Sequence, residues 1–477
     1  MNRRPLQLRS LIVACFIVIV SGCTSTPDGP RLDLIYDKAT KYHAPDRNPI
    51  IVIPGVLGSR LVDEESGRVV WGAFDRFSVN PKRADDARLL SLPISGEANF
   101  TELRDTVRPD GVLDMVNIRL LGIPVDIRAY VGILATLGVG GYRDESLGLN
   151  GLDYGDDHFT CFQFDYDWRR DNVENAARLD AFIQEKRAYI QAEYKKRYGL
   201  ENAEVKFDIV AHSMGGLITR YYMRYGATPL PANGSLPPLT WEGAENLERV
   251  ILVGTPNAGA GEAFEQLMRG YDPGRPVLPH YPAPILGTFP SVYELLPRTR
   301  HGLIQFEDGT PVDIFNGEIW TENNWGLAAD TEEVTDFLRI ALPEAPDDTS
   351  RRRHAEAFQT AALKQAQTFQ AALDIPSAPP KGTNIYLVAG DSEETPFTIE
   401  VSRETGAVRF KDFTQGDGRV PRSSALMDER VGSTWKPELV SPVTWSSVTF
   451  LPSSHIGLTS DPVFTNNVLY MLLEDPR

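Results

Sequence analysis

The segment "FDIVAHSMGGLITRYYMRYG" (207–226) places Ser213 between small residues, where an apolar run meets an amphipathic one. A small-x-Ser-x-Gly pattern is weak by itself, because average residue frequencies produce it in about one chain of this length in three. Its position carries more information, since a serine at a tight strand-to-helix turn is the arrangement of an acyl-transfer nucleophile. Such a turn requires neighbours without bulk, which fits Ala211, Gly215 and Gly216.

A serine is a poor nucleophile at neutral pH, so a histidine must take its proton and a carboxylate must hold that histidine. With the chain order Ser, acid, His that accompanies this turn, the candidate bases are His280, His301, His354 and His455. Among them, only His455, in "TFLPSSHIGLTSDP", follows a predicted strand of the main sheet. His212, beside Ser213, is expected to point elsewhere and to pack or to bond a loop.

Two carboxylates compete for the third position. Asp391 directly follows the predicted strand "NIYLVAG", where simple hydrolases of this kind place their acid. Asp417, in "QGDGRVP", lies in a Gly-flanked turn that could also be a bare hairpin turn. The residues alone leave both candidates open.

Acyl transfer also needs N–H donors aimed at the developing oxyanion. The N–H of Met214, just after the nucleophile, can supply one. A sharp turn at Pro54 and Gly55, in "PGVLGS", would direct the N–H of Val56 toward the same point. No metal or other cofactor is expected, because the sequence has neither an HExxH helix nor a cluster of ligand residues.

Six short apolar runs, most of them rich in β-branched residues, predict strands of the kind that are buried on both faces. Helical patterns lie between them, notably at 172–199, so we expect a mostly parallel sheet with helices on both faces. Cys161 is expected to be a buried thiol within the second run. In chain order the runs are "NPIIVIPG", "FTCFQFDY", "VKFDIVAH", "RVILVGTP", "NIYLVAGD" and "TWSSVTFLP".

Two stretches interrupt this alternation. Residues 62–124 are loop-rich, and residues 259–382 combine a Pro-rich segment with Ala/Gln-rich helical patterns. The strand pattern resumes after each, so we interpret them as a lid and a cap inserted into one domain that spans 48–477.

The N-terminal residues predict export. Three arginines precede the apolar run "LIVACFIVIV" and the sequence "SGC", which is the pattern of a secretory signal peptide over 1–22. "VSGC" resembles a bacterial lipoprotein signal, in which Cys23 becomes the lipidated N-terminus, and residues 23–47 would then be the anchored N-terminus and its tether. The alternative is a plain signal peptide cut nearby. We therefore expect a lipid-anchored protein on a bacterial membrane, with the outer membrane preferred.

Charge limits the partners. The 477 residues carry a formal net charge of −17, which disfavours nucleic acid and anionic lipid as partners held by charge alone. Membrane contact would have to be apolar or through the N-terminal lipid anchor. The sequence does not define an oligomeric state.

Seven ordered segments resemble the lecithin:cholesterol acyltransferase family, which includes phospholipase A and phospholipid:diacylglycerol acyltransferase relatives. They extend from about Asn48 to the end of the chain, and together they are far more specific than any one of them. The segments are "IIVIPGVLGSRLVD", "VVWGAF", "GGYRDE" leading to "FDYDWRRDN", "IVAHSMGGL", "VGTPNAGA", "GDGRVP" and "SSHIG".

The resemblance implies an α/β-hydrolase fold, with Ser213 as nucleophile, Asp417 as acid and His455 as base. It also implies that Val56 and Met214 provide the oxyanion N–H groups. Trp71 would lie in the mobile lid segment, and "YDWR", with Asp167, Trp168 and Arg169, would support the loop after its strand.

The sequence also departs from the family. The cysteines of the animal enzymes, including the pair that closes the lid, are missing, so the 62–124 region is expected to move differently. Cholesterol is not the expected acceptor, because the nucleophile segment is closer to those of general bacterial lipases.

The expected activity is hydrolysis of a lipid carboxylic ester, such as a phospholipid, through an acyl-enzyme on Ser213. The alternative is an O-acyltransferase that moves the acyl group from phospholipid to an alcohol, since both reactions pass through the same intermediate. A second alternative is a lipoprotein scaffold that kept the fold without the chemistry.

Overall fold

The computed structural model describes most of the chain from residue 30 onward, and the chain from Leu32 onward forms one compact unit. The expected signal peptide and the expected lipidation site, Cys23, lie outside the described residues. No helix in the described part has the length and hydropathy needed to cross a membrane. The described ranges are 30–73, 79–94, 100, 103–113, 115–120, 123–128, 130–272 and 279–476.

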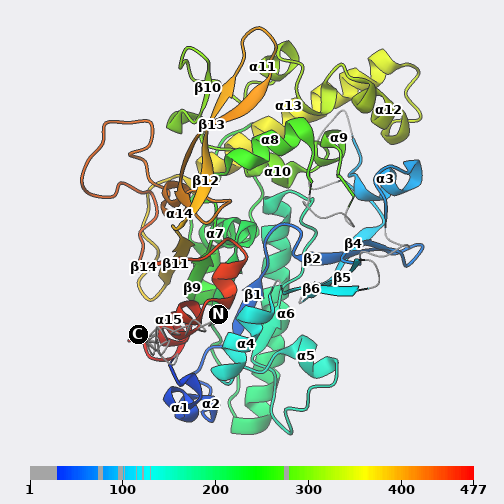
Figure 1. The fold of residues 1–477 in the computed structure, drawn as a ribbon. Helices are drawn as coiled ribbons and strands as arrows, with labels where there is room; N and C mark the ends of the chain where they lie inside the picture. The colour runs from blue at the N-terminus through cyan, green and yellow to red at the C-terminus, as the bar shows by residue number, and fades with distance from the viewer. Residues whose placement is uncertain are drawn as a thin grey trace, which may run out of the picture. The chain divides into compact units, whose positions relative to one another are not determined.

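The centre of the fold is a six-stranded sheet in which every neighbouring pair is parallel (Figure 1). The strand order is β14-β11-β9-β8-β1-β7. The six apolar runs of the sequence supply these six strands, so the predicted parallel sheet is confirmed. The strands are β1 (Ile50–Ile53), β7 (Cys161–Gln163), β8 (Phe207–His212), β9 (Leu247–Val253), β11 (Asn384–Gly390) and β14 (Ser447–Leu451).

Alternate side chains of the strands serve two separate cores, as the two-residue period of a strand requires. Ile50 and Val52 of β1 pack in one cluster with side chains of α4 and α15, which lie on the near side of the sheet in Figure 1. Ile51 and Ile53 pack in a larger cluster with side chains of α6 and α7. Helices therefore cover both faces. Their bounds are Val131–Val139 (α4), Asn172–Tyr198 (α6), Met214–Tyr225 (α7) and Pro462–Leu473 (α15).

Local chemistry sets both ends of α6, the long helix predicted at 172–199. The carboxylate of Asp171 accepts hydrogen bonds from the N–H groups of Val173 and Glu174 and so caps the first turn. Gly199 follows the last turn with a φ of 68°, a conformation that glycine adopts without cost. This places the Asp171 carboxylate inside the protein, where it is fully buried.

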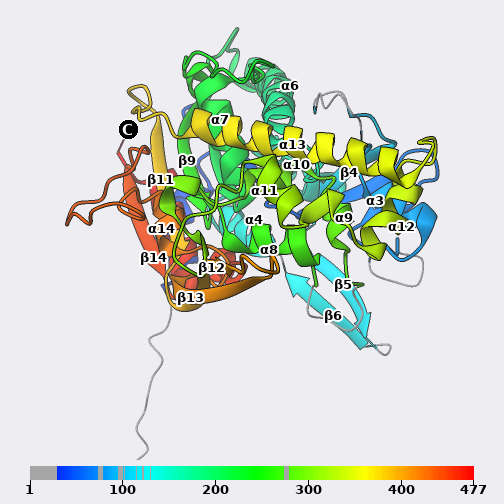
Figure 2. The same cartoon turned by 90° about the horizontal axis from the view of Figure 1, so that it is seen from above.

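The segment 62–124 contains two strands, β3 and β4, and the end of β2, which together form a three-stranded antiparallel sheet of order β3-β2-β4. A two-stranded hairpin, β5–β6, follows it and projects away from the neighbouring elements in Figure 2. The bounds are β2 (Ser59–Asp63), β3 (Val69–Trp71), α3 (Ala84–Leu90), β4 (Val107–Val112), β5 (Met115–Leu120) and β6 (Ile123–Arg128).

The segment 259–382 is mainly helical. Its longest helix, α13, packs against α7, α10 and α12 and crosses the view in Figure 2. The elements are α8 (Gly261–Arg269), α9 (Ala283–Leu286), α10 (Pro290–Glu294), η3 (Thr299–His301), β10 (Ile304–Phe306), α11 (Gly317–Glu322), η4 (Gly326–Ala328), α12 (Glu332–Ala341) and α13 (Asp348–Leu373).

Another three-stranded sheet, which was not predicted from the sequence, joins this helical segment to the chain beyond it. β10 pairs in parallel with β12 (Glu393–Val401), and β12 pairs antiparallel with β13 (Val408–Gly416). We call the β10-β12-β13 sheet the cap sheet. It ends one residue before Asp417.

Short helices complete the described part, and Cys161 is a buried free thiol at the start of β7, as predicted. The short helices are α1 (Leu32–Ile35), α2 (Asp37–Thr40), α5 (Glu145–Leu149), η2 (Glu242–Asn246), α14 (Arg422–Leu426) and η5 (Gly457–Ser460).

Candidate active site

Ser213 occupies the turn between β8, which ends at His212, and α7, which begins at Met214. Its φ is 54° and its ψ is −126°, a conformation that costs a residue with a side chain on the order of 1–3 kcal/mol. The surrounding structure holds the strain, because the Ser213 N–H donates to the carbonyl of Val253 at 2.8 Å. The result is a serine Oγ set at the end of a central strand.

The small residues around Ser213 are required by close packing. A Cβ on Gly55 would lie 2.7 Å from the Cβ of Ser213, and a Cβ on Gly216 would lie 2.0 Å from Oγ1 of Thr255. The loop after β1 therefore presses directly on the serine. The same loop carries Val56.

The structure brings His455 and Asp417 to this serine. His455 Nε2 lies 3.0 Å from Ser213 Oγ, and its Nδ1 lies 2.7 Å from Asp417 Oδ2. The backbone adds a further bond, from the N–H of His455 to the carbonyl of Asp417 at 2.8 Å. The three side chains thus form one hydrogen-bonded series, in the order that a serine nucleophile, its base and the orienting acid require.

Asp417 is held as a carboxylate. Its side chain is 1 % exposed, and that burial by itself would raise the pKa. The pKa is nevertheless below its usual value, because His455 is beside it and the N–H groups of Arg419 and Val420 donate to Oδ1 at 3.0 and 2.7 Å. The Gly-Asp-Gly-Arg-Val turn thus stabilises the charged form needed to orient His455.

The other candidate acid and two of the other candidate bases are not part of this hydrogen-bonded series. Asp391 lies 3.8 Å from Arg422 in an ion pair. Of the other candidate bases, His301 lies 3.3 Å from Glu429, and His354 is exposed on α13. His212 bonds two loops, as its position in the sequence predicted.

Met214 directly follows Ser213 in the chain, and Val56 directly follows Gly55, whose α-carbon packs against the serine side chain. Within the described residues, neither the N–H group of Val56 nor that of Met214 has a hydrogen-bond acceptor in the protein. Both are therefore free to bind an oxyanion formed beside Ser213.

A cavity of about 350 Å³ opens beside Ser213 and His455. Trp71 forms part of its wall, with Nε1 bonded to the carbonyl of Leu57 at 2.8 Å and its ring 5.5 Å from those of Trp168 and Tyr281. Most of the other side chains are apolar, including Leu90, Leu113, Leu286, Phe289, Val292 and Leu295.

Two charged side chains, Glu262 and Arg419, also line the cavity and form an ion pair. Arg419 Nη1 lies 2.6 Å from Glu262 Oε2, and burial raises the pKa of Glu262 even though Arg419 acts against it. Sequence reasoning did not single out either residue. Arg419 could have been identified as a candidate from its position inside the "GDGRVP" segment, beside Asp417.

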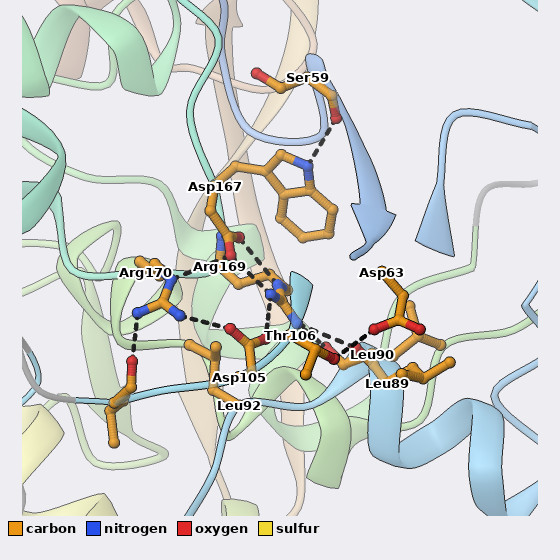
Figure 3. Close-up of polar contacts among 12 residues, drawn as sticks. Ser59, Asp63, Leu89, Leu90, Leu92, Asp105, Thr106, Asp167, Arg169 and Arg170 are labelled. Carbon is orange, nitrogen blue, oxygen red and sulfur yellow. Dashed lines mark hydrogen bonds and ion pairs between the residues drawn. The ribbon is translucent and has the colours of Figure 1, made fainter. Parts of the chain in front are cut away.

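A buried charge network supports the cavity wall from behind (Figure 3). Arg169, which is fully buried, bonds Asp167 through Nη2 at 2.7 Å and Asp105 at 2.6 Å, and its Nη1 donates to the carbonyl of Leu90 at 3.1 Å. Arg170 also bonds Asp105, at 2.5 Å. This network ties the loop after β7 to the segment around α3, in the supporting role expected from "YDWR".

The fold and the arrangement of side chains define the class of protein. A parallel sheet covered on both faces, with a serine at the turn after a central strand, is an α/β-hydrolase. The family model of lecithin:cholesterol acyltransferase matches residues 149–420, more than half of the chain. The chain belongs to the lecithin:cholesterol acyltransferase family, as its sequence segments predicted.

Solved structures also resemble the chain. A structure of the Tle4–Tli4 complex has a TM-score of 0.57 at 16% identity, covering 90% of this chain and 99% of that one. Mature lipase BlEst2 of Bacillus licheniformis has a TM-score of 0.31 at 12% identity, covering 91% and 94%. EstA from Clostridium botulinum has a TM-score of 0.31 at 13% identity, covering 90% and 88%. No curated protein matches the sequence.

Proposed function

We propose that this protein is a serine hydrolase of lipid carboxylic esters that works through an acyl-enzyme. The observation that carries the proposal is the hydrogen-bonded series from Asp417 through His455 to Ser213, at the wall of an apolar cavity. An apolar wall suits a fatty acyl chain, because its burial is favourable by about 0.8 kcal/mol for each methylene. Family membership supports the same class of substrate.

In the first half of the reaction, Ser213 Oγ attacks the ester carbonyl and His455 Nε2 takes the serine proton. Asp417 stabilises the imidazolium that forms. The N–H groups of Val56 and Met214 bind the oxyanion of the tetrahedral intermediate. As that intermediate collapses, His455 gives its proton to the departing alcohol, and the acyl group stays on Ser213.

In the second half, His455 takes a proton from water, and the hydroxide equivalent attacks the acyl-enzyme. A second intermediate forms in the same oxyanion site and collapses as His455 gives its proton back to Ser213 Oγ, which releases a free fatty acid. An alcohol in place of water gives a new ester by the same steps, and this O-acyltransferase reaction is the second candidate. Its support is the family, whose name describes an acyl transfer.

We further propose that the segments 62–124 and 259–382 act as lid and cap, and that the protein is exported and anchored by a lipid on Cys23 to a bacterial outer membrane. The cavity lining supports the first part, since it takes Trp71 and Leu90 from one segment and Phe289 from the other. The signal-like N-terminus supports the second part. Cys23→Ala should release the protein from the membrane fraction; retention there would contradict the anchor.

The decisive test is labelling of the full chain with a fluorophosphonate probe. Labelling of the native protein that disappears in Ser213→Ala supports a serine enzyme. A folded protein without labelling, or labelling that survives in Ser213→Ala, supports the inactive scaffold instead.

Product analysis separates the two reactions. The purified enzyme is given a defined phospholipid with and without added alcohols, and free fatty acid and new ester are counted. We expect mainly free fatty acid; a predominance of new ester would establish the transferase.

A further inference from the structure

His212 and Tyr130 form a hydrogen-bonded bridge between two loops at the active site. The N–H of Gly55, in the loop after β1, lies 2.8 Å from the Tyr130 hydroxyl. That hydroxyl lies 3.3 Å from Nδ1 of His212, and Nε2 of His212 lies 3.1 Å from the carbonyl oxygen of His455. Tyr130 and His212 are both buried.

The chemistry of the groups fixes the direction of every bond in this bridge. A carbonyl oxygen only accepts, so Nε2 of His212 carries a hydrogen and donates it to His455. In a neutral imidazole, Nδ1 is then an acceptor, which receives the hydroxyl hydrogen of Tyr130. The hydroxyl oxygen in turn accepts from Gly55. Every polar atom of the two side chains is therefore used within the bridge.

Burial keeps both groups in the neutral forms that the bridge needs. It lowers the pKa of His212 to about 3 and raises the pKa of Tyr130 above its ordinary value of 10. His212 consequently stays neutral over the working range of pH, and its tautomer is set by its two partners.

The two ends of the bridge are the parts of the site that must be placed relative to Ser213. Gly55 directly precedes Val56, whose N–H is the proposed oxyanion donor, and a Cβ on Gly55 would lie 2.7 Å from the Cβ of Ser213. At the other end, the carbonyl belongs to His455 itself. Packing adds to the restraint, because a Cβ on Gly58 would lie 2.8 Å from the Tyr130 hydroxyl.

We propose that Tyr130 and His212 are positioning residues, which hold the oxyanion loop and the backbone of the catalytic base at a fixed separation across Ser213. The inference rests on the proposed serine chemistry. Neither residue exchanges a proton with substrate; they act through Val56 and His455. A loop displaced by a fraction of an ångström weakens binding of the oxyanion. Because Tyr130 and His212 also line the cavity, KM is measured beside kcat to detect any effect on substrate binding.

The test compares Tyr130→Phe with the native full-length protein on a short-chain chromogenic ester. We expect kcat to fall by about tenfold to a hundredfold, less than or equal to the loss of a whole oxyanion donor, with KM changed less than about twofold. The rate of fluorophosphonate labelling should fall in parallel. Tyr225→Phe is the matched control, since it removes a buried hydroxyl that bonds the carbonyl of Ala372 at 2.8 Å, away from the site. It should lose similar stability and keep its kcat.

A double variant tests whether the two residues act together. His212→Gln keeps a donor toward His455 and loses the acceptor that Tyr130 uses. If one bridge carries both effects, Tyr130→Phe combined with His212→Gln should be little slower than the slower single variant. Multiplicative losses would mean that the residues act separately and would overturn the bridge.

Other outcomes are equally clear. If Tyr130→Phe folds and keeps the native kcat and labelling rate, the positioning role is wrong. The role is also wrong if Tyr225→Phe loses as much kcat as Tyr130→Phe. In both cases, labelling of the native protein still supports the serine enzyme. If the native protein itself is not labelled, the proposed function fails and the positioning role falls with it.

Discussion

Gly390 packs directly against Asp417. A Cβ on Gly390, the last residue of β11, would lie 2.6 Å from the Cβ of Asp417 and 2.5 Å from the carbonyl oxygen of Ser453. Asp417 therefore fills the space at the end of β11, although it lies farther along the chain than Asp391. A carboxylate from beyond the cap sheet thus lies at the end of β11, where it bonds His455.

The first prediction concerns the identity of the acid. Asp417→Asn should lower kcat by about 10⁴-fold, because an amide can hold the imidazole in the wrong tautomer and cannot stabilise its charge. Asp391→Asn, which disturbs a long, partly exposed ion pair with Arg422, should stay within about twofold of native kcat. Steady-state hydrolysis of a chromogenic ester measures both. If only Asp391→Asn loses activity, the acid has been assigned to the wrong residue.

The second prediction follows from the contact at Gly390. Gly390→Ala forces a shift in Asp417 or in the backbone at Ser453, so the free energy of unfolding should fall by about 1–3 kcal/mol and kcat should fall with it. Gly138→Ala is the control, because a Cβ at this position in α4 meets no atom within 4 Å and alanine is the better helix former. Denaturant titration and the ester assay test the pair. Native activity in Gly390→Ala would contradict the tight contact.

The third prediction concerns the network behind the cavity (Figure 3). Asp105→Asn leaves Arg169 and Arg170 short of a carboxylate in a buried setting, which should cost about 3–5 kcal/mol of stability. Asp348→Asn disturbs pairs with Arg339 and Arg351 at the start of α13 and should lower stability much less, because solvent screens the exposed charges. Chemical denaturation of both variants gives the comparison, and equal losses would refute the role of burial.

The fourth prediction is a dependence of stability on pH. Burial raises the pKa of Asp171 to about 6, and burial together with the charge of Asp171 raises that of Glu294 well above its ordinary value of 4.5. The folded state thus keeps protons that the unfolded chain releases from about pH 4 upward, so these groups make the free energy of unfolding fall as pH rises.

Glu294→Gln tests that dependence, because the glutamine oxygen can still accept from the N–H of Asn172. The variant should lose less stability than the native protein between about pH 5 and pH 8. Denaturant titrations at the two pH values supply the measurement. Parallel losses in the two proteins would show that Glu294 does not set the slope.

The six central strands were predictable from apolar runs, because most of these strands are buried on both faces; β14, at the edge of the sheet, is only partly buried. Sequence reasoning missed β12, which is exposed at its start and buried over its last four residues, and β13, most of which is exposed or partly buried; the two sequences also carry charges and Pro396. A half-exposed hairpin with such a sequence resembles a polar loop. The charge network of Arg169 was likewise not predictable, because its partner Asp105 is distant in the chain. The sequence shows only the adjacent charged residues of "DYDWRRD".

The serine and the histidine were predictable from local patterns, but the residues alone could not choose between two carboxylates. The position of Asp391 or Asp417 in the sequence indicates which loop carries the carboxylate. It does not indicate whether that carboxylate points toward His455. Tyr130 gave no signal at all, because it lies 82 residues from His212 and belongs to no recognisable motif. Such long-range pairs depend on how the loops pack.

The cap sheet has one more consequence. β10 lies inside the segment proposed as the cap, and its hydrogen bonds continue through β12 to β13, whose end leads directly into Asp417. The backbone hydrogen bonds of the cap sheet therefore connect the segment proposed as the cap to the residue that bonds His455. If that segment moves as proposed, we expect its motion to change the Asp417–His455 distance as well as access to the cavity.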